Sequence, residues 1–128
     1  MSRDERMPQP KRTAPPKVSP VVIGGVRYEA LHWGRSRELG QNGGYIAAFD
    51  PGTNRELWIL KVYDVAYDGK MEEDVQDVFI TEIHLDGKTL FVTNESSERF
   101  EMDLASGKVR ALTPLGPGRE LPVDSAKR

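Results

Sequence analysis

Alternation of apolar and polar residues runs through the middle of the chain and predicts short β-strands. It is clearest in residues 26–31, whereas residues 56–67 form a longer run whose two faces are both expected to be covered in its middle. Gly-Gly, Pro-Gly, Asp-Gly and Ser-Gly pairs mark turns between the runs. Strands are expected at residues 26–31, 44–50, 56–67, 78–85, 89–93, 99–103 and 108–112, and a short apolar run at residues 21–23 precedes the first of them. The pattern therefore predicts an all-β fold, an antiparallel meander of about seven strands.

Both ends of the chain lack this alternation. Residues 1–20 hold five prolines with five basic and two acidic side chains, and residues 116–128 return to proline, glycine and charge. Such segments bury too little apolar surface to order themselves. We therefore expect a disordered, basic, proline-rich tail at residues 1–20, one β domain at residues 21–115, and a flexible C-terminal tail at residues 116–128.

Charge and composition disfavour several classes of function. Residues 21–115 carry ten basic and sixteen acidic side chains, so this domain repels the phosphates of nucleic acids. The chain has no cysteine and hence no disulfide, thiol nucleophile or thiolate metal site. Its first residues show no apolar leader, and no stretch approaches the roughly 20 apolar residues that span a membrane. We expect a cytoplasmic protein that binds neither nucleic acid nor membrane.

Two segments share one plan 53 positions apart along the chain. Each has an aspartate, two spacer residues, a threonine or serine, a residue that tolerates positive φ, and a base. These residues are Asp50, Thr53, Asn54 and Arg55 in the first copy and Asp103, Ser106, Gly107 and Lys108 in the second. The pattern predicts two tight turns in which carboxylate and hydroxyl oxygens accept backbone N–H groups.

The first copy resembles the tryptophan-docking repeat of quinoprotein (PQQ)-type β-propellers, A-x-D-x-x-T-G-K-x-x-W. Ala48, Asp50, Thr53 and Trp58 match, while the copy at residues 101–111 is degenerate. The resemblance implies a structural motif with Trp58 packed internally, separate from any quinone site. A propeller needs at least about four blades, and this chain has material for fewer than two. We therefore expect no cofactor, and a propeller-blade-like pair packed as a sandwich or a strongly twisted sheet.

The loop at residues 33–43 is the main candidate for binding a ligand or a partner. Long glycine-bearing loops often carry function. Arginine pairs hold carboxylates or phosphates, and an aromatic ring offers a flat contact surface. The candidate residues are Trp33, Arg35, Arg37, Gln41 and Asn42.

Residues 68–77 are polar, with room for at most two helical turns, and their acidic side chains are interpreted as a docking patch for a basic partner. The patch comprises Asp68, Glu72, Glu73 and Asp74. A calcium loop starting at Asp64 is rejected because Ala66 and Val75 occupy ligand positions. No metal site is therefore expected.

No catalytic pattern stands out, because His32 and His84 are the only histidines and no nucleophile elbow is present. The leading hypothesis is a non-catalytic protein-binding or accessory module. One alternative is a binder of small anionic ligands, or an enzyme, in which Arg35 and Arg37 anchor the ligand near His32. Another is a structural subunit of a larger β assembly. Exposed sheet edges favour a protein partner, and a homodimer is one form of it.

Overall fold

The structure, a computed structural model, describes residues 15–66 and 77–122. The described residues form two four-stranded antiparallel sheets and one two-stranded pair. The helical element among them is a 3-10 helix at Gly34–Arg37. The expected all-β fold is therefore confirmed.

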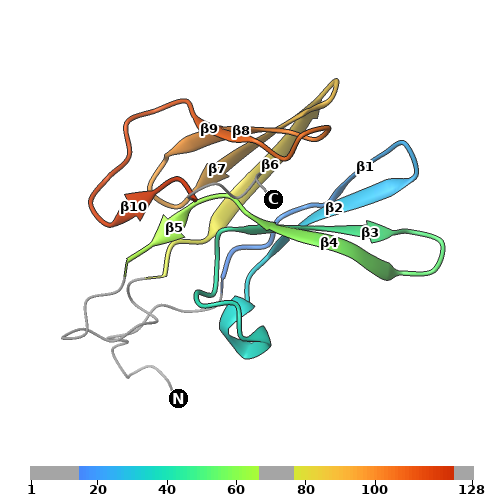
Figure 1. The fold of residues 1–128 in the computed structure, drawn as a ribbon, viewed down its shortest axis with the longest axis horizontal. Coiled ribbons are helices and arrows are strands. Elements are labelled where there is room, and N and C mark those ends of the chain that lie inside the picture. Colours follow the sequence, from blue (N-terminus) through green and yellow to red (C-terminus); the bar gives the residue numbers. More distant parts are fainter. Residues whose placement is uncertain (1–14, 67–76, 123–128) are drawn as a thin grey trace, which may run out of the picture.

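Each four-stranded sheet is an up-and-down meander in chain order. The first sheet contains β1 (Val21–Ile23), β2 (Val26–Leu31), β3 (Tyr45–Asp50) and β4 (Arg55–Lys61). The second sheet contains β6 (Ile80–Asp86), β7 (Thr89–Asn94), β8 (Arg99–Asp103) and β9 (Val109–Ala111). The remaining pair joins β5 (Asp64–Val65) to β10 (Arg119–Glu120). Figure 1 shows the two sheets one above the other, as in a sandwich, with β5 and β10 at one end.

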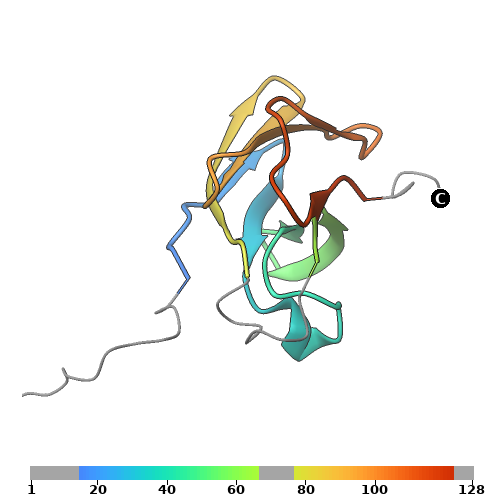
Figure 2. The same ribbon diagram turned by 90° about the vertical axis from the view of Figure 1, so that its left-hand side faces the viewer.

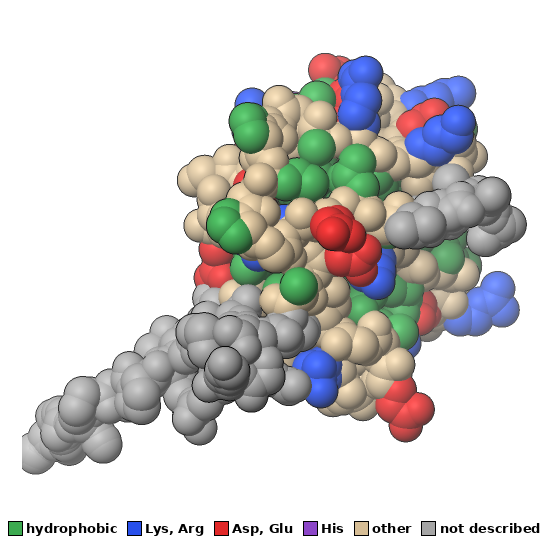
Figure 3. Space-filling model, turned by 60° about the vertical axis from the view of Figure 1, so that its left-hand side comes forward, with side chains coloured by type: hydrophobic (Ala, Val, Ile, Leu, Met, Phe, Trp, Pro, Cys, Tyr) green, Lys and Arg blue, Asp and Glu red, His purple; other side chains and the backbone are tan. Residues whose placement is uncertain are grey.

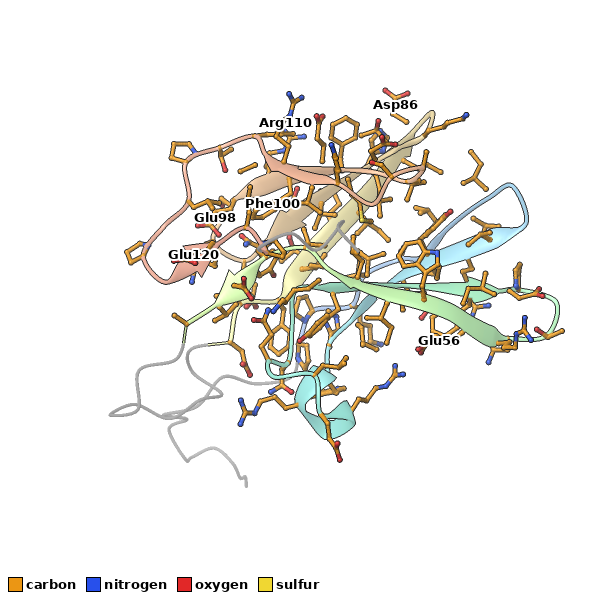
Figure 4. The ribbon with its side chains drawn as sticks, viewed as in Figure 1. Glu56, Asp86, Glu98, Phe100, Arg110 and Glu120 are labelled. Carbon is orange, nitrogen blue, oxygen red and sulfur yellow. The ribbon has the colours of Figure 1, made fainter. Side chains whose placement is uncertain are left out.

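The core lies between the facing sides of the two sheets. Ile46 of β3 and Phe100 of β8 are fully buried there, and Figure 4 labels Phe100. Tyr63, which follows β4, stacks on Phe100 with 5.1 Å between ring centroids. Its hydroxyl donates to the Val78 carbonyl at 2.7 Å. Burial raises the pKa of Tyr63 above its ordinary value, so this tyrosine is an internal link between the sheets.

The outer face of the second sheet is polar. Leu90 and Val92 of β7 point into the core, whereas Thr89 and Thr93 on the opposite face are partly exposed. This alternation is typical of an antiparallel sheet with water on one side. The second sheet therefore covers the core with one face and presents the other to solvent.

The long strand expected at residues 56–67 is divided in the structure. β4 ends at Lys61, and the chain then leaves the first sheet to form the separate strand β5. The Val62 N–H donates to the Gly44 carbonyl at 2.7 Å, and Tyr63 turns into the core. The middle of the run is covered as expected, because Leu60 and Lys61 are partly buried and Val62 and Tyr63 are fully buried. Leu57, near the start of the run, is 41% exposed. β4 is an edge strand, with β3 as its one neighbour in the sheet.

The C-terminal part of the fold extends beyond residue 115. Arg119 and Glu120, expected in a flexible tail, form β10 opposite Val65 and Asp64. The Ala66 N–H also donates to the Gly118 carbonyl at 2.8 Å. With β1 as a separate strand, β10 and the division of the long run, the described residues hold ten strands rather than about seven. Residues 123–128 lie outside the described residues.

The N-terminal part of the fold also begins before residue 21. The ring nitrogen Nε2 of His32 donates to the Pro16 carbonyl at 2.8 Å, and Val18 packs against the core. The described residues 15–20 form no strand or helix. The remainder of the expected tail, residues 1–14, lies outside the described residues.

The two repeated turns have the same hydrogen bonds. Asp50 Oδ1 accepts from the Gly52 N–H at 2.9 Å, and Asp103 Oδ1 accepts from the Ala105 N–H at 3.0 Å. Thr53 and Ser106 each accept an N–H two residues further on, at 3.2 Å in both turns. Asn54 and Gly107 have positive φ values of 64° and 77°. The predicted turn chemistry is present in both, in the β3–β4 and β8–β9 connections.

Candidate functional site

The loop between β2 and β3 is closed by its own backbone. The Gly34 N–H donates to the Asn42 carbonyl at 2.9 Å. Ser36 Oγ donates to the Trp33 carbonyl at 2.7 Å, and the Tyr45 hydroxyl donates to the Leu39 carbonyl. Figures 1 and 2 both show this loop and its 3-10 helix below the first sheet, on the side away from β8 and β9.

Gln41 fixes the loop to the chain that follows β4. Its Nε2 donates to the Gly43 carbonyl at 2.9 Å and to the Tyr63 carbonyl at 2.8 Å. Its Oε1 accepts from the Val65 N–H at 2.9 Å. The side chain is 4% exposed. Gln41, which the sequence suggested as a ligand contact, satisfies buried backbone groups instead.

Asn42 and Arg35 also make contacts that hold the loop. Asn42 Nδ2 donates to Asp77 Oδ2 at 3.0 Å, and Asn42 Oδ1 accepts from the Arg35 N–H at 3.1 Å. The Arg35 guanidinium donates to the Gly40 carbonyl at 3.0 Å. These two side chains therefore define the shape of the loop.

Arg37 connects the loop to the first sheet through an exposed ion pair. Its guanidinium lies 2.9 Å from the carboxylate of Glu56, at the start of β4, and Glu56 is labelled in Figure 4. The hydrogen bond to Glu56 raises the pKa of Arg37. The pair orients Arg37 toward β4.

Trp33 is the large exposed side chain of the loop. Its indole is 55% exposed, although one edge contacts Phe79 with 6.0 Å between ring centroids. His32 packs on the same Phe79 ring at 5.2 Å. Of the five side chains suggested by the sequence, Trp33 is thus the one whose large apolar surface faces solvent.

Glycines allow the loop to pack closely against the core. A Cβ added at Gly43 would lie 2.8 Å from both Phe79 Cδ1 and the Val78 carbonyl oxygen. One added at Gly34 would lie 2.2 Å from the Gln41 carbonyl oxygen. Gly34 and Gly43, two of the glycines that drew attention to the loop, therefore serve its packing.

We predict that Gly43→Ala lowers the free energy of unfolding by about 1–3 kcal/mol, because the methyl group overpacks the Phe79 contact. Urea unfolding followed by circular dichroism measures the change. Gly52→Ala is the matched control: the nearest atom to its added Cβ, Asp50 Oδ1, is at an ordinary 3.4 Å. Equal losses in the two variants would contradict the packing role.

The acidic patch Asp68, Glu72, Glu73 and Asp74 lies outside the described residues. Within residues 15–66 and 77–122, no group of three His, Asp or Glu side chains is placed to hold a metal ion. His84 lies on β6 beside Phe91, with 6.3 Å between ring centroids.

An apolar groove at the open end of the sandwich was not predicted from the sequence. One part, of about 200 Å³, is lined by Trp58 and Leu60 of β4 and by the turn at residues 103–107. A second part, of about 370 Å³, continues toward the β1–β2 and β6–β7 turns. Leu104 and Ala105 line both parts. The groove therefore lies between the two copies of the repeated unit.

Trp58 lies at this groove and not wholly inside the fold. It is 38% exposed, and its ring contacts Tyr28 at 5.9 Å. The resemblance to the propeller repeat implied that it packs internally. In the structure it flanks the second turn, at residues 103–107, because β4 is the edge strand nearest that turn.

Glu98 is a second feature that the sequence did not reveal. This side chain, 4% exposed, accepts from Arg119 Nε at 3.0 Å, from Asn94 Nδ2 at 2.8 Å and from the Gly116 N–H. Burial acts to raise the pKa of Glu98, but the hydrogen bonds from Asn94, Gly116 and Arg119 and the charge of Arg119 together lower it. The cluster fastens the β10 segment to the second sheet.

No protein-family model matches the chain, and no curated protein matches its sequence. Within the described residues, no helix has the length and apolar character needed to cross a membrane. The functional interpretation therefore depends on the geometry above.

Proposed function

We propose that this chain is a non-catalytic protein-binding module that contacts its partner through Trp33. The observation that carries the proposal is a tryptophan, 55% exposed, on a loop whose backbone and amide side chains are fixed from within. Tryptophan and arginine are enriched among residues that dominate binding energy. A fixed loop also loses less conformational entropy when it binds.

The alternative of an anionic-ligand site has weaker support. Gln41 and Asn42 use their amides within the loop, and Arg37 is paired with Glu56. These groups would have to leave existing partners to bind a ligand. A protein surface can instead cover Trp33 without disturbing them.

The acidic patch at residues 68–74 remains the second contact in this proposal. On the face of the molecule drawn in Figure 3, positively and negatively charged side chains are interspersed with hydrophobic ones. Mixed charge of this kind supports a protein partner better than a polyanion such as nucleic acid. The proposal includes a cytoplasmic location, supported by the cysteine-free composition.

We further propose that the resemblance to the PQQ-type propeller repeat reflects a scaffold role. The two matching turns both connect the third and fourth strands of a four-stranded meander, β3–β4 and β8–β9. The tryptophan of the first copy flanks the turn of the second. In this proposal the repeat holds the two sheets together and leaves binding to the β2–β3 loop.

The test places a photoreactive phenylalanine analogue at position 33 of the full chain in its native cells. We expect a discrete cross-linked protein from position 33 and none from position 112, where Leu112 is similarly exposed at 40%. With the partner purified, Trp33→Ala should weaken binding about 30-fold, as expected of a hot-spot residue, and Leu112→Ala should not. Identical cross-links at both positions, or none at position 33, would overturn the proposal.

A further inference from the structure

The four edge strands of the two sheets differ in how they are protected against pairing with a strand of another chain. β1 and β9 have three residues each, and β9 carries Arg110 at its centre. β6 carries exposed charge at Glu82 and Asp86 and contacts the first sheet. Shortness and charge are the usual devices that keep a sheet edge from pairing with another chain. Three of the four edges use at least one of them.

β4 is the edge without such protection in its centre. It has seven residues, and its middle is the uninterrupted apolar run Leu57–Leu60. A bulge near Leu57 shifts its register with β3, but residues 58–61 continue in regular pairing. Leu57 and Trp58 are both exposed. A long apolar edge of this kind is a template for a further strand.

The charged residues of β4 neither favour a charged partner strand nor repel a second copy of the same strand. Lys61 pairs with Asp64 at 2.5 Å, and Glu56 pairs with Arg37. Arg55 lies opposite Asp50 in the β3–β4 register. Each charge on β4 thus has an opposite charge beside it. An apolar strand with neutralised ends is the partner that this edge fits.

We propose that β4 pairs antiparallel with β4 of a second copy of this chain, about a two-fold axis at Ile59. In that register Trp58 lies opposite Leu60 of the second copy, and Leu57 lies opposite its Lys61. No like charges face each other within Leu57–Lys61. Because the pairing is isologous, both copies lose the free edge at once, and the assembly closes as a dimer.

The groove beside Trp58 supports this register. Trp58 and Leu60 line the same part of the groove, of about 200 Å³, and strand pairing brings those of both copies together. A single strand pair with a few side chains is a small interface, so we expect a dissociation constant on the order of 10 μM.

Sedimentation velocity on the full chain, from about 1 to 300 μM, tests the pairing. We expect a shift from the 14.4 kDa monomer toward twice that mass as concentration rises. Ile59→Lys places two lysines on the axis and should weaken dimerisation at least about 30-fold. Leu112→Lys, the matched change on an exposed leucine that directly follows β9, should leave it unchanged.

A second measurement covers the case in which Ile59→Lys does not fold. Trp33→Phe leaves Trp58 as the one tryptophan, and its emission should move to shorter wavelength as the dimer forms. A monomer at 300 μM, dimerisation unaffected by a folded Ile59→Lys variant, or equal weakening by Leu112→Lys would each overturn the pairing. The proposed function is tested at Trp33, on a different surface, so either proposal can fail alone.

Discussion

Arg119→Met is expected to lower the free energy of unfolding by about 3 kcal/mol at pH 7. Arg119 and Glu98 form an ion pair in which the side chains are 12% and 5% exposed. Methionine fills similar space but cannot neutralise the carboxylate. Glu98 would keep the Asn94 amide and the Gly116 N–H as donors and would remain a buried charge without a counter-ion. Urea unfolding at pH 7 measures the loss.

The decrease in the free energy of unfolding caused by Arg119→Met should become smaller as the pH falls. In the native protein the pKa of Glu98 is lowered, so its contribution is present above the unfolded value of about 4.3 and disappears as the pH falls through the folded value. In Arg119→Met, loss of the guanidinium makes the pKa of Glu98 higher than in the native protein, so protonation of Glu98 begins at higher pH and relieves the variant. We therefore expect the two unfolding free energies to converge as the pH falls through the range in which Glu98 becomes protonated, first in the variant and then in the native protein.

Two controls distinguish the effect of breaking a buried ion pair from the effect of removing a single charge. Adding Glu98→Gln to Arg119→Met removes both charges and should recover most of the stability. Arg110→Met breaks the exposed pair with Glu101 and should cost less than about 1 kcal/mol. If Arg110→Met and Arg119→Met cost the same, the cluster does not fasten β10 as proposed.

This cluster also shows which parts of the fold can be predicted from sequence. The turns at Asp50 and Asp103 were predicted correctly because the hydrogen bonds that the two turns share join residues two to four positions apart. Strand alternation is local in the same way, so seven of the ten strands begin or end close to where the pattern places them. Local chemistry was enough for these elements.

β5 and β10 depend on contacts between distant residues. Val65 is held by Gln41, 24 positions away, and Arg119 by Glu98, 21 positions away. Residues 56–67 have a continuous strand pattern, and nothing within the run marks the break after Lys61. The proline and glycine near β10 are typical of a tail. Only the three-dimensional partners reveal these two strands.

The candidate site likewise combines features that the local sequence predicts with features that depend on distant contacts. The β2–β3 loop was identified by its length, its glycines and its tryptophan. However, its glycines and amides hold the loop in place, and Trp33 is its exposed apolar contact surface. The groove at Trp58 could not be predicted, because it forms where β4 meets the turn at residues 103–107 of the other sheet.

Gln41→Met should likewise lower the free energy of unfolding by about 3 kcal/mol. Methionine matches glutamine in length but offers no amide. The substitution leaves the buried Tyr63 carbonyl and the Val65 N–H without the partners they have in the native protein. Each buried polar group left unpaired costs about 1–3 kcal/mol. Urea unfolding gives the total, and hydrogen exchange at the Val65 amide, which should speed up, locates the change.

Comparison with Trp33→Ala turns this result into a test of how the loop is organised. Trp33 is more than half exposed, so its truncation should change stability by less than about 1 kcal/mol while weakening partner binding about 30-fold. Gln41→Met should show the opposite balance at temperatures where it stays folded: a large loss of stability and a small change in affinity. If Gln41→Met weakened binding without lowering stability, Gln41 would be a contact residue, and the division between a fixed frame and an exposed indole would be wrong. That outcome would restore the ligand-contact role first suggested by the sequence, because the amide would then be available to an outside partner rather than bound to Tyr63 and Val65.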